Sequence, residues 1–229
     1  MVTGMHEARY ALAKVAINCF RAQTYPEREL LIINHGNNSL FTGEKSIVEV
    51  RIRKGENDTV GDLRNLALKH ASGDLVINWD DDDWHGPERM SMQFAAYGDK
   101  CAVVLKNQIR FNLVNNSAFC FRINKGLAGT ILHSRDVAFR YPSFVRGSDT
   151  AFMHAFGKSR VVLDNDPAVY IRFYHGLNLW DARHIMHRLA GSDVHDQIDL
   201  SSGQREVLKD ALERNYEEYA LFRKLSCPI

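Results

Sequence analysis

Four consecutive aspartates, Asp80–Asp83, lie between the apolar run "LVINW" and a segment that begins with Pro87. Carboxylate oxygens, together with substrate phosphates, are the ligands that Mg²⁺ and Mn²⁺ prefer. Two structural alternatives are an exposed acidic turn and a helix N-terminus near Pro87, where the helix dipole favours acids. Four acids in a row exceed what capping needs, so the sequence favours a cation site.

The elements before the aspartates predict where they lie. Apolar spacing indicates a helix over 8–20, strands over 29–34 and 47–52, a helix over 57–73 capped by Asp58 or Thr59, and a strand over 74–79. This alternation implies parallel pairing with crossover helices and an α/β fold. In such sheets ligands bind beyond the carboxyl ends of the strands. The aspartates are therefore expected at the ligand-binding edge.

The second half predicts an antiparallel extension and C-terminal helices. Strands are expected over 101–107, 109–114 and 119–124, with a hairpin turn at 115–118. A helix over 148–157 precedes strands over 160–163 and 168–175. From Trp180 the pattern becomes helical, and a final amphipathic helix is expected from about 203 to 225. With no repeat or linker in the sequence, we expect a single domain over 1–229.

Composition narrows the class of protein. The 229 residues are 45% hydrophobic, carry a formal net charge of +1, and contain no apolar run near the ~20 residues of a membrane helix. The start "MVTGMHEARY" lacks the blocks of a signal peptide, so a cytoplasmic protein is expected. The four cysteines are Cys19, Cys101, Cys120 and Cys227. Without a CxxC pair, they are expected to be reduced and mostly buried.

Four sequence blocks resemble successive blocks of family 2 glycosyltransferases with the GT-A fold. They read "FRAQTYPERELLIINHG", "LRNLALKHASGDLVINWDDDDWHGPERM", "GLAGTILHSRDVAF" with "RGSDTAFMHAF", and "VYIRFYHGLNLW". They occur in order between about Ala8 and Trp180. The resemblance implies a GT-A-like domain with a nucleotide-binding half over about 1–98, an acceptor-side half over about 99–180, and C-terminal helices over about 181–229. It also implies transfer of a sugar from a nucleotide diphosphate sugar.

The resemblance implies roles for individual residues. In the DxD-type motif, Asp82 would bind Mn²⁺ or Mg²⁺ while Asp80 lies nearer the ribose. A C-terminal histidine, His175, would contact the metal or a phosphate, although a hydrogen-bonded structural histidine is its alternative. Arg64 matches a base-side arginine, although an exposed helix arginine is its structural alternative. The other residues implied in nucleotide-sugar binding are Thr3, Gly4, Asn34, His35, Asp81 and Gly129. The resemblance implies a UDP-sugar as the donor. Asn34 and His35 depart from it, because they stand where the family has an acid that contacts uracil.

Asp149 is the candidate catalytic base. Transfer to a hydroxyl needs a group that removes its proton, and a second carboxylate can do so. In "VRGSDTAF" the resemblance maps the base of inverting members to Asp149, although Ser148 replaces the glutamate that usually precedes it. The structural alternative is that Asp149 caps the following helix.

Two other functions and the acceptor stay open at this point. A nucleotidyltransferase of the same fold would normally carry a Gly-rich, basic loop after its first strand, which "VTGMHEAR" is not. A catalytically lapsed module that binds a glycan or an anionic polymer is the other alternative. The segment Lys100–Arg146, called here the basic segment, holds eight Lys or Arg and one acid. These charges either belong to ordinary solvated faces or attract an anionic acceptor, for which a nucleic acid is possible but has no specific support.

Overall fold

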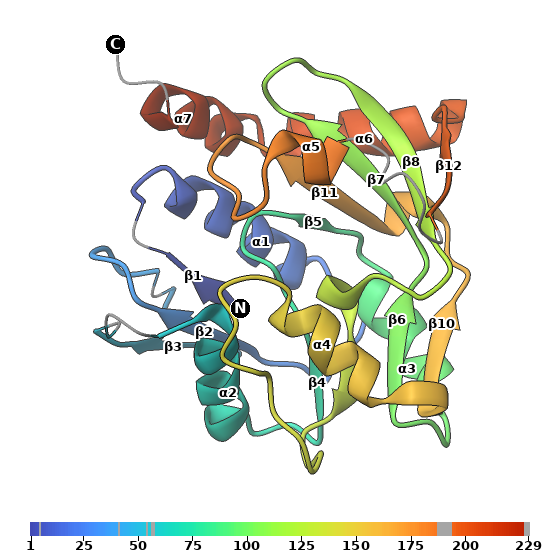
Figure 1. The fold of residues 1–229 in the computed structure, drawn as a ribbon. Coiled ribbons are helices and arrows are strands. Elements are labelled where there is room, and N and C mark those ends of the chain that lie inside the picture. The colour runs from blue at the N-terminus through green and yellow to red at the C-terminus, as the bar shows by residue number, and fades with distance from the viewer. Residues whose placement is uncertain (5, 41, 54, 56–57, 187–193, 227–229) are drawn as a thin grey trace.

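The computed structural model describes residues 1–4, 6–40, 42–53, 55, 58–186 and 194–226. Within these ranges the chain forms three sheets with helices packed around them (Figure 1). The predicted α/β class is confirmed. The division into functional portions stays a prediction.

The first sheet is parallel, as expected, with strand order β1-β2-β3. Its strands are β1 (Val2–Thr3), β2 (Leu30–Asn34) and β3 (Ile47–Arg51). Two helices accompany it, α1 (Arg9–Arg21) and α2 (Val60–His70). The α1 helix buries an apolar stripe, and Thr59 begins α2 through a capping box with Asp62. The ends of β1 and β2 therefore lie together next to the start of α1.

The second sheet is mixed, with strand order β10-β6-β9-β4. Its strands are β4 (Leu75–Ile77), β6 (Ala102–Leu105), β9 (Leu132–Ser134) and β10 (Arg160–Leu163). Accompanying helices are α3 (Arg89–Tyr97), α4 (Ser148–Ala155) and the 3₁₀ turns η1 (Ala128–Thr130) and η2 (Gly157–Ser159). An aromatic cluster of Tyr141, Phe152 and Phe156 surrounds His133 on β9. This cluster fixes α4 against the sheet.

The third sheet has strand order β12-β8-β7-β11-β5 and contains the predicted antiparallel extension only in part. The expected strand over 101–107 is β6 of the second sheet, where it pairs with β10 in parallel. Its strands are β5 (Trp84–His85), β7 (Asn107–Asn112), β8 (Ala118–Ile123), β11 (Tyr170–Tyr174) and β12 (Val194–Ile198). The predicted hairpin joins β7 to β8, whereas β11 pairs with β7 in parallel. The 3₁₀ turn η3 (Pro167–Val169) leads into β11.

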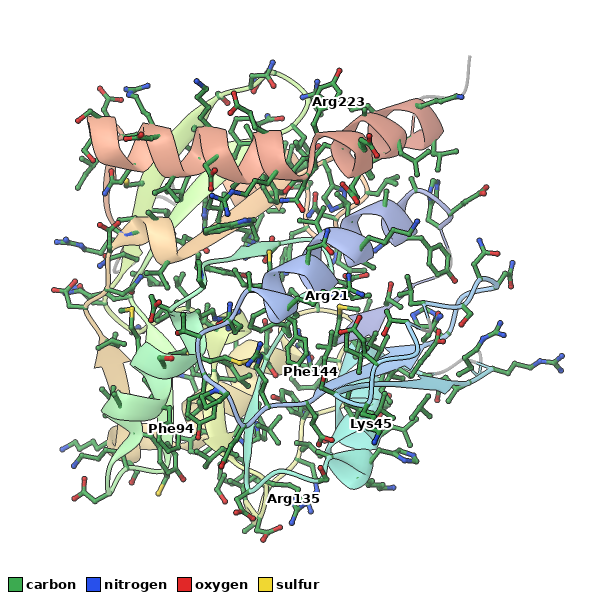
Figure 2. All side chains as sticks on the ribbon, turned by 180° about the vertical axis from the view of Figure 1, so that it is seen from behind. Arg21, Lys45, Phe94, Arg135, Phe144 and Arg223 are labelled. Atoms are coloured by element: carbon green, nitrogen blue, oxygen red, sulfur yellow. The ribbon has the colours of Figure 1, made fainter. Side chains whose placement is uncertain are left out.

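The C-terminal helices are α5 (Ala182–Met186), α6 (Ser202–Arg214) and α7 (Tyr216–Ser226). Seen from behind, α6 and α7 run along one edge of the molecule (Figure 2). Arg223 donates to the carbonyl of Leu113 at 3.2 Å and to Oδ1 of Asn116 at 3.1 Å. This contact ties α7 to the hairpin between β7 and β8. No helix in the described ranges is long and apolar enough to span a membrane.

The structure differs from the predicted elements in three places. Strand β9 was not expected, and because β4 pairs with it in antiparallel orientation, the second sheet is mixed. Strand β12 follows α5 where only helix was expected, and positions 187–191 of the predicted helix lie outside the described residues. The predicted final helix is divided at Asn215, which ends α6 with φ −120° and donates its side-chain amide to Ala211 O at 2.9 Å.

Candidate active site

The aspartate motif occupies the loop between β4 and β5, as predicted for the ligand-binding edge. The fully buried Arg89 on α3 anchors this loop by donating to Asn78 O at 2.8 Å and to Nδ1 of His85. With Nδ1 accepting, His85 donates from Nε2 to the carbonyl of Asp80 at 3.1 Å. Trp79 stacks on His85 with ring centroids 3.9 Å apart. These buried contacts hold the backbone of the motif.

Asp80 faces α2 and meets Arg64. Nη2 of Arg64 lies 3.1 Å from Oδ1 of Asp80, and Nη1 of the same guanidinium lies 4.0 Å from Oδ2 of Asp149. Burial raises the pKa of Asp80, although the charge of Arg64 opposes this shift. A Cβ added at Gly129 would lie 3.0 Å from the Asp80 carboxylate, so this glycine allows the close approach. The structure therefore brings together four residues that the sequence assigned to the site: Arg64, Asp80, Gly129 and Asp149.

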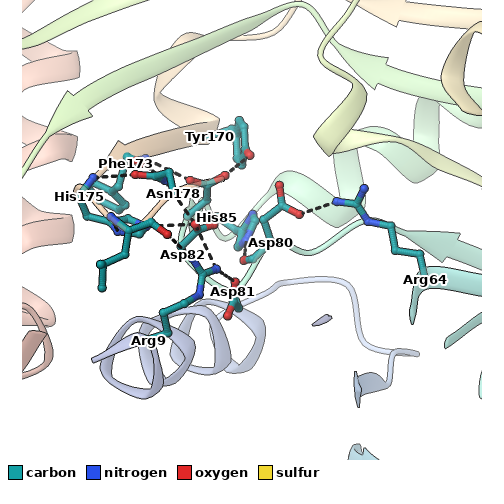
Figure 3. Close-up of polar contacts among 12 residues, drawn as sticks. Arg9, Arg64, Asp80, Asp81, Asp82, His85, Tyr170, Phe173, His175 and Asn178 are labelled. Atoms are coloured by element: carbon teal, nitrogen blue, oxygen red, sulfur yellow. Dashed lines mark hydrogen bonds and ion pairs between the residues drawn. The ribbon is translucent and has the colours of Figure 1, made fainter. Parts of the chain in front are cut away.

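Asp81 and Asp82 share a cation from α1. Nη2 of Arg9 forms an ion pair with Asp81 and lies 3.2 Å from Oδ2 of Asp82 (Figure 3). The second carboxylate oxygen of Asp81 is buried with no hydrogen-bond partner. Arg9 was not predicted as a site residue, although its position at the start of α1 is unusual. A cation at the first position of a helix is disfavoured by the helix dipole, which indicates a partner elsewhere.

Two residues after β11 complete the surroundings of Asp82. Nε2 of His175 lies 3.1 Å from Oδ2 of Asp82, and the side-chain amide of Asn178 lies 3.4 Å from the same oxygen. Burial would raise the pKa of Asp82, but the charge of Arg9 and the hydrogen bond from His175 outweigh it and hold the pKa below its ordinary value. Asp82 therefore stays ionised, as a metal-binding carboxylate must.

Asp83 serves the fold. Its carboxylate accepts from the hydroxyl of Tyr170 and from the backbone N–H of Phe173 at 3.1 Å. Burial raises the pKa of Asp83 well above its ordinary value, and the charge of Asp82 adds to this shift. Asp83 thus connects the motif to β11 and brings the residues after that strand to Asp82.

The ends of β1 and β2 lie beside this group, as predicted. A Cβ added at Gly4 would lie 3.6 Å from the His35 ring and 3.9 Å from Cδ of Arg9. Thr3 is buried, and its hydroxyl has no partner in the described structure. Asn34 donates to Glu49 Oε1 at 2.6 Å and accepts from a backbone N–H in the following loop. The contacts of these residues with a nucleotide stay predictions.

The Asp82 carboxylate fits a divalent cation that is completed by phosphate oxygens. In the described ranges, no three His, Cys, Asp or Glu side chains are grouped closely enough to hold a metal by themselves. Mg²⁺ and similar hard cations commonly take one or two carboxylates, with substrate phosphates and water as their other ligands. The ionised and partly exposed Asp82 carboxylate matches that mode.

Some cationic side chains of the basic segment have partners within the protein. Lys106 pairs with Asp164 at 3.2 Å, and the buried Arg110 donates to a backbone carbonyl at 2.5 Å. Arg146 differs, because its guanidinium lies over the ring of Trp180 at 5.4 Å, in the loop that leads to Asp149. An anionic acceptor stays a prediction.

The cysteines agree in part with the expectation. Cys19, Cys101 and Cys120 are free thiols, but Cys101 is exposed while the other two are buried. Cys227 lies outside the described residues.

The comparisons with known proteins agree with this geometry. The model of the family described as glycosyl transferase family 2 matches residues 7–142, more than half of the 229 residues. The chain belongs to this family. A search of curated proteins found no significant match to the sequence.

Solved structures show that this family 2 chain has the GT-A fold. S. aureus TarS in complex with UDP shares 16% identity with a TM-score of 0.60, covering 95% of this chain and 71% of that one. Mannosyltransferase PcManGT from Pyrobaculum calidifontis, in complex with GDP-Man and Mn²⁺, shares 13% identity with a TM-score of 0.54, covering 98% and 72%. The chain spans 59% and 42% of two further TarS structures.

Proposed function

We propose that the chain is a metal-dependent, inverting glycosyltransferase that moves a sugar from a nucleotide diphosphate sugar, with UDP as the expected nucleotide, to an acceptor hydroxyl. The observation that carries this proposal is the position of Arg64. One guanidinium contacts Asp80 of the motif at 3.1 Å and Asp149 at 4.0 Å. The candidate donor motif and the candidate base therefore lie on either side of one side chain.

Asp149 has the exposure that a base needs. Its side chain is 26% exposed, and it lies in the first turn of α4. As the acceptor oxygen forms a bond to the sugar carbon, its proton passes to the Asp149 carboxylate, and the bond from that carbon to the diphosphate oxygen breaks. Attack on the face opposite to the leaving diphosphate inverts the configuration at this carbon. Arg64 would keep Asp149 beside the donor during this step.

Asp82 would hold the divalent cation. When bound, this cation supplies positive charge that stabilises the diphosphate as it leaves. Support comes from the ionised state of Asp82 and from the two similar structures described above, one bound to UDP and the other to GDP-Man and Mn²⁺. These structures motivate testing both nucleotides.

A donor panel tests the proposal. Thermal stability is measured with UDP-, GDP-, CDP- and TDP-sugars, each with Mn²⁺ and with EDTA, since a ligand that binds the folded state raises its stability. We expect one nucleotide class to stabilise the protein only with Mn²⁺. Asp82→Asn should abolish this shift, whereas Asp164→Asn, which alters the exposed pair with Lys106, should retain it. Equal stabilisation in EDTA would contradict the metal requirement.

Product analysis tests the reaction itself. Proton NMR of the donor reaction should show release of the nucleoside diphosphate and a product with inverted anomeric configuration. Retention of configuration would contradict the role of Asp149 as base. Tight, Mn²⁺-dependent donor binding without any hydrolysis or transfer would support the lapsed binding module instead. Formation of a nucleoside triphosphate and a sugar 1-phosphate from the donor when pyrophosphate is added would support a nucleotidyltransferase.

A further inference from the structure

We propose that His175 is a positioning residue that donates a hydrogen bond to Asp82 and is not a ligand of the cation. This inference rests on the proposed metal-dependent function. It reverses the role that the sequence resemblance implied for His175. Three observations on the imidazole and its neighbours support it, and each concerns a different property: the tautomer, the burial of the ring, and the hydrogen bonds that Asp82 already makes.

The first observation fixes the proton on the imidazole. Nδ1 of His175 accepts the backbone N–H of Leu177 at 3.2 Å. A ring nitrogen that accepts carries no hydrogen, so in the neutral ring the proton is on Nε2, which lies 3.1 Å from Oδ2 of Asp82. Ligation of a cation through Nε2 would need the proton on Nδ1, facing the N–H of Leu177. The N–H on Nδ1 and the N–H of Leu177 would then point at each other with no acceptor between them.

The local backbone enforces this tautomer. Gly176 has φ +84°, a left-handed conformation that favours glycine, and the resulting turn directs the N–H of Leu177 back at the ring. Asn178 closes the turn by accepting the backbone N–H of His175 at 2.9 Å. The turn formed by "HGLN" therefore makes Nδ1 an acceptor and leaves Nε2 as the donor of the imidazole.

The second observation is burial. The imidazole has no exposed surface and packs edge-on against Phe222 of α7, with centroids 5.2 Å apart. A cation that keeps water and phosphate ligands needs open space at each protein ligand. The Asp82 side chain has such space, because it is 16% exposed. The accessible member of this pair is therefore the carboxylate.

The third observation concerns the two oxygens of Asp82. Oδ2 is within reach of donors from Arg9, His175 and Asn178, at 3.2, 3.1 and 3.4 Å (Figure 3). For Oδ1, the described structure contains no such partner. Donors that converge on one oxygen fix the orientation of the carboxylate and leave the other oxygen for the cation. This is how hydrogen bonds from neighbouring groups commonly orient metal ligands.

Two substitutions separate positioning from ligation. In His175→Gln the terminal amide nitrogen can take the place of Nε2 as a donor, whereas His175→Ala has no donor. Affinity for Mn²⁺ in the presence of UDP is measured by calorimetry. We expect His175→Gln to remain within about threefold of the unaltered chain and His175→Ala to lose about 10- to 100-fold, as when a supporting hydrogen bond to a metal ligand is removed. His133→Gln, at another buried histidine, is the control and should not change this affinity.

Pulsed electron paramagnetic resonance of the unaltered chain with Mn²⁺ and UDP gives a second readout. We expect no coupling from a directly bound imidazole nitrogen. Such a coupling, an equal loss of affinity in His175→Gln and His175→Ala, or an unchanged affinity in His175→Ala would each overturn the inference. If the unaltered chain with UDP binds no Mn²⁺ at all, the proposed metal dependence fails, and the inference falls with it.

Discussion

Replacement of Asp149 by asparagine separates catalysis from helix capping. The Asp149 carboxylate makes two contacts that could stabilise the fold. Its Oδ1 accepts the N–H of Thr150 at 2.8 Å, and its Oδ2 lies 4.0 Å from Arg64. Asparagine keeps an oxygen acceptor for the first contact. The charge lost at the first turn of α4 is worth about 0.3–1 kcal/mol. A partly exposed ion pair at 4.0 Å contributes at most about 1 kcal/mol.

These magnitudes predict a small loss of stability and a large loss of turnover. A destabilisation of about 1 kcal/mol lowers the Tm of a chain of this size by about 2–4 °C. Loss of a general base lowers the rate by about 100-fold or more, which corresponds to about 2.7 kcal/mol or more in the barrier. Donor affinity should stay within a few-fold, because Asp149 touches the motif only through Arg64.

The assay is release of the nucleoside diphosphate from the donor that stabilises the protein best, with Tm and donor affinity measured on the same preparation. Asp166→Asn is the matched control, since Asp166 caps η3 by accepting the N–H of Ala168 at 2.8 Å. It should lose comparable stability and keep its turnover. If Asp149→Asn loses Tm but retains turnover, Asp149 is a capping residue and the assignment of the base is refuted.

Three further predictions test the fold. Thr59→Ala removes the side-chain half of the α2 capping box and should lower the free energy of unfolding by about 1 kcal/mol. Urea unfolding measures this loss, and the dependence of the free energy on urea concentration should not change. An unaltered free energy of unfolding would show that the cap is not needed. Burial raises the pKa of the Cys19 thiol to about 12, whereas Cys101 is exposed. A thiol reagent at pH 8.5 should therefore label Cys101 and spare Cys19, as measured by peptide mass spectrometry. Rapid labelling of Cys19 would contradict its burial. Burial lowers the pKa of His133 to about 4, below the ~6.5 of the unfolded chain, so below pH 6.5 the unfolded chain binds a proton that the folded chain does not. Stability should therefore fall by up to about 3 kcal/mol as the pH drops from 6.5 to 4, and His133→Phe should flatten this slope in urea unfolding; an unaltered slope would exclude His133 as its source.

Local patterns predicted those elements whose signals are contained in neighbouring residues. The capping box at Thr59 and the apolar stripe of α1 act over one or two turns, and both helices occur as expected. The position of the aspartates followed from the strand that precedes them. Strand β9 could not be predicted in this way, because it is three residues long and is stabilised by pairing with β4 and β6. Those strands are distant in sequence.

The site residues that could be predicted also belong to local sequence patterns, whereas those that were missed depend on long-range contacts. A resemblance could place Arg64, Asp80 and Asp149 together because they belong to sequence blocks of the family. Arg9 and Asn178 were missed, since their contacts with Asp82 cross 73 and 96 positions of the chain and no local pattern requires them. For Arg9, the unfavourable position at a helix N-terminus was the available signal.

These long-range contacts explain how four adjacent carboxylates coexist in a buried loop. Each one points to a partner from a different segment: Arg64 from α2, Arg9 from α1, the turn after β11, and β11 itself. Removing Arg9 from the buried Asp81 costs about 3–5 kcal/mol, because the remaining charge is left uncompensated, whereas the partly exposed Asp80 loses less without Arg64. The motif therefore requires α1, α2 and β11 to be in place at once. Because the same contacts hold Asp80 and Asp82 in fixed orientations, the interactions that stabilise the fold would also prepare the proposed donor site before any donor binds.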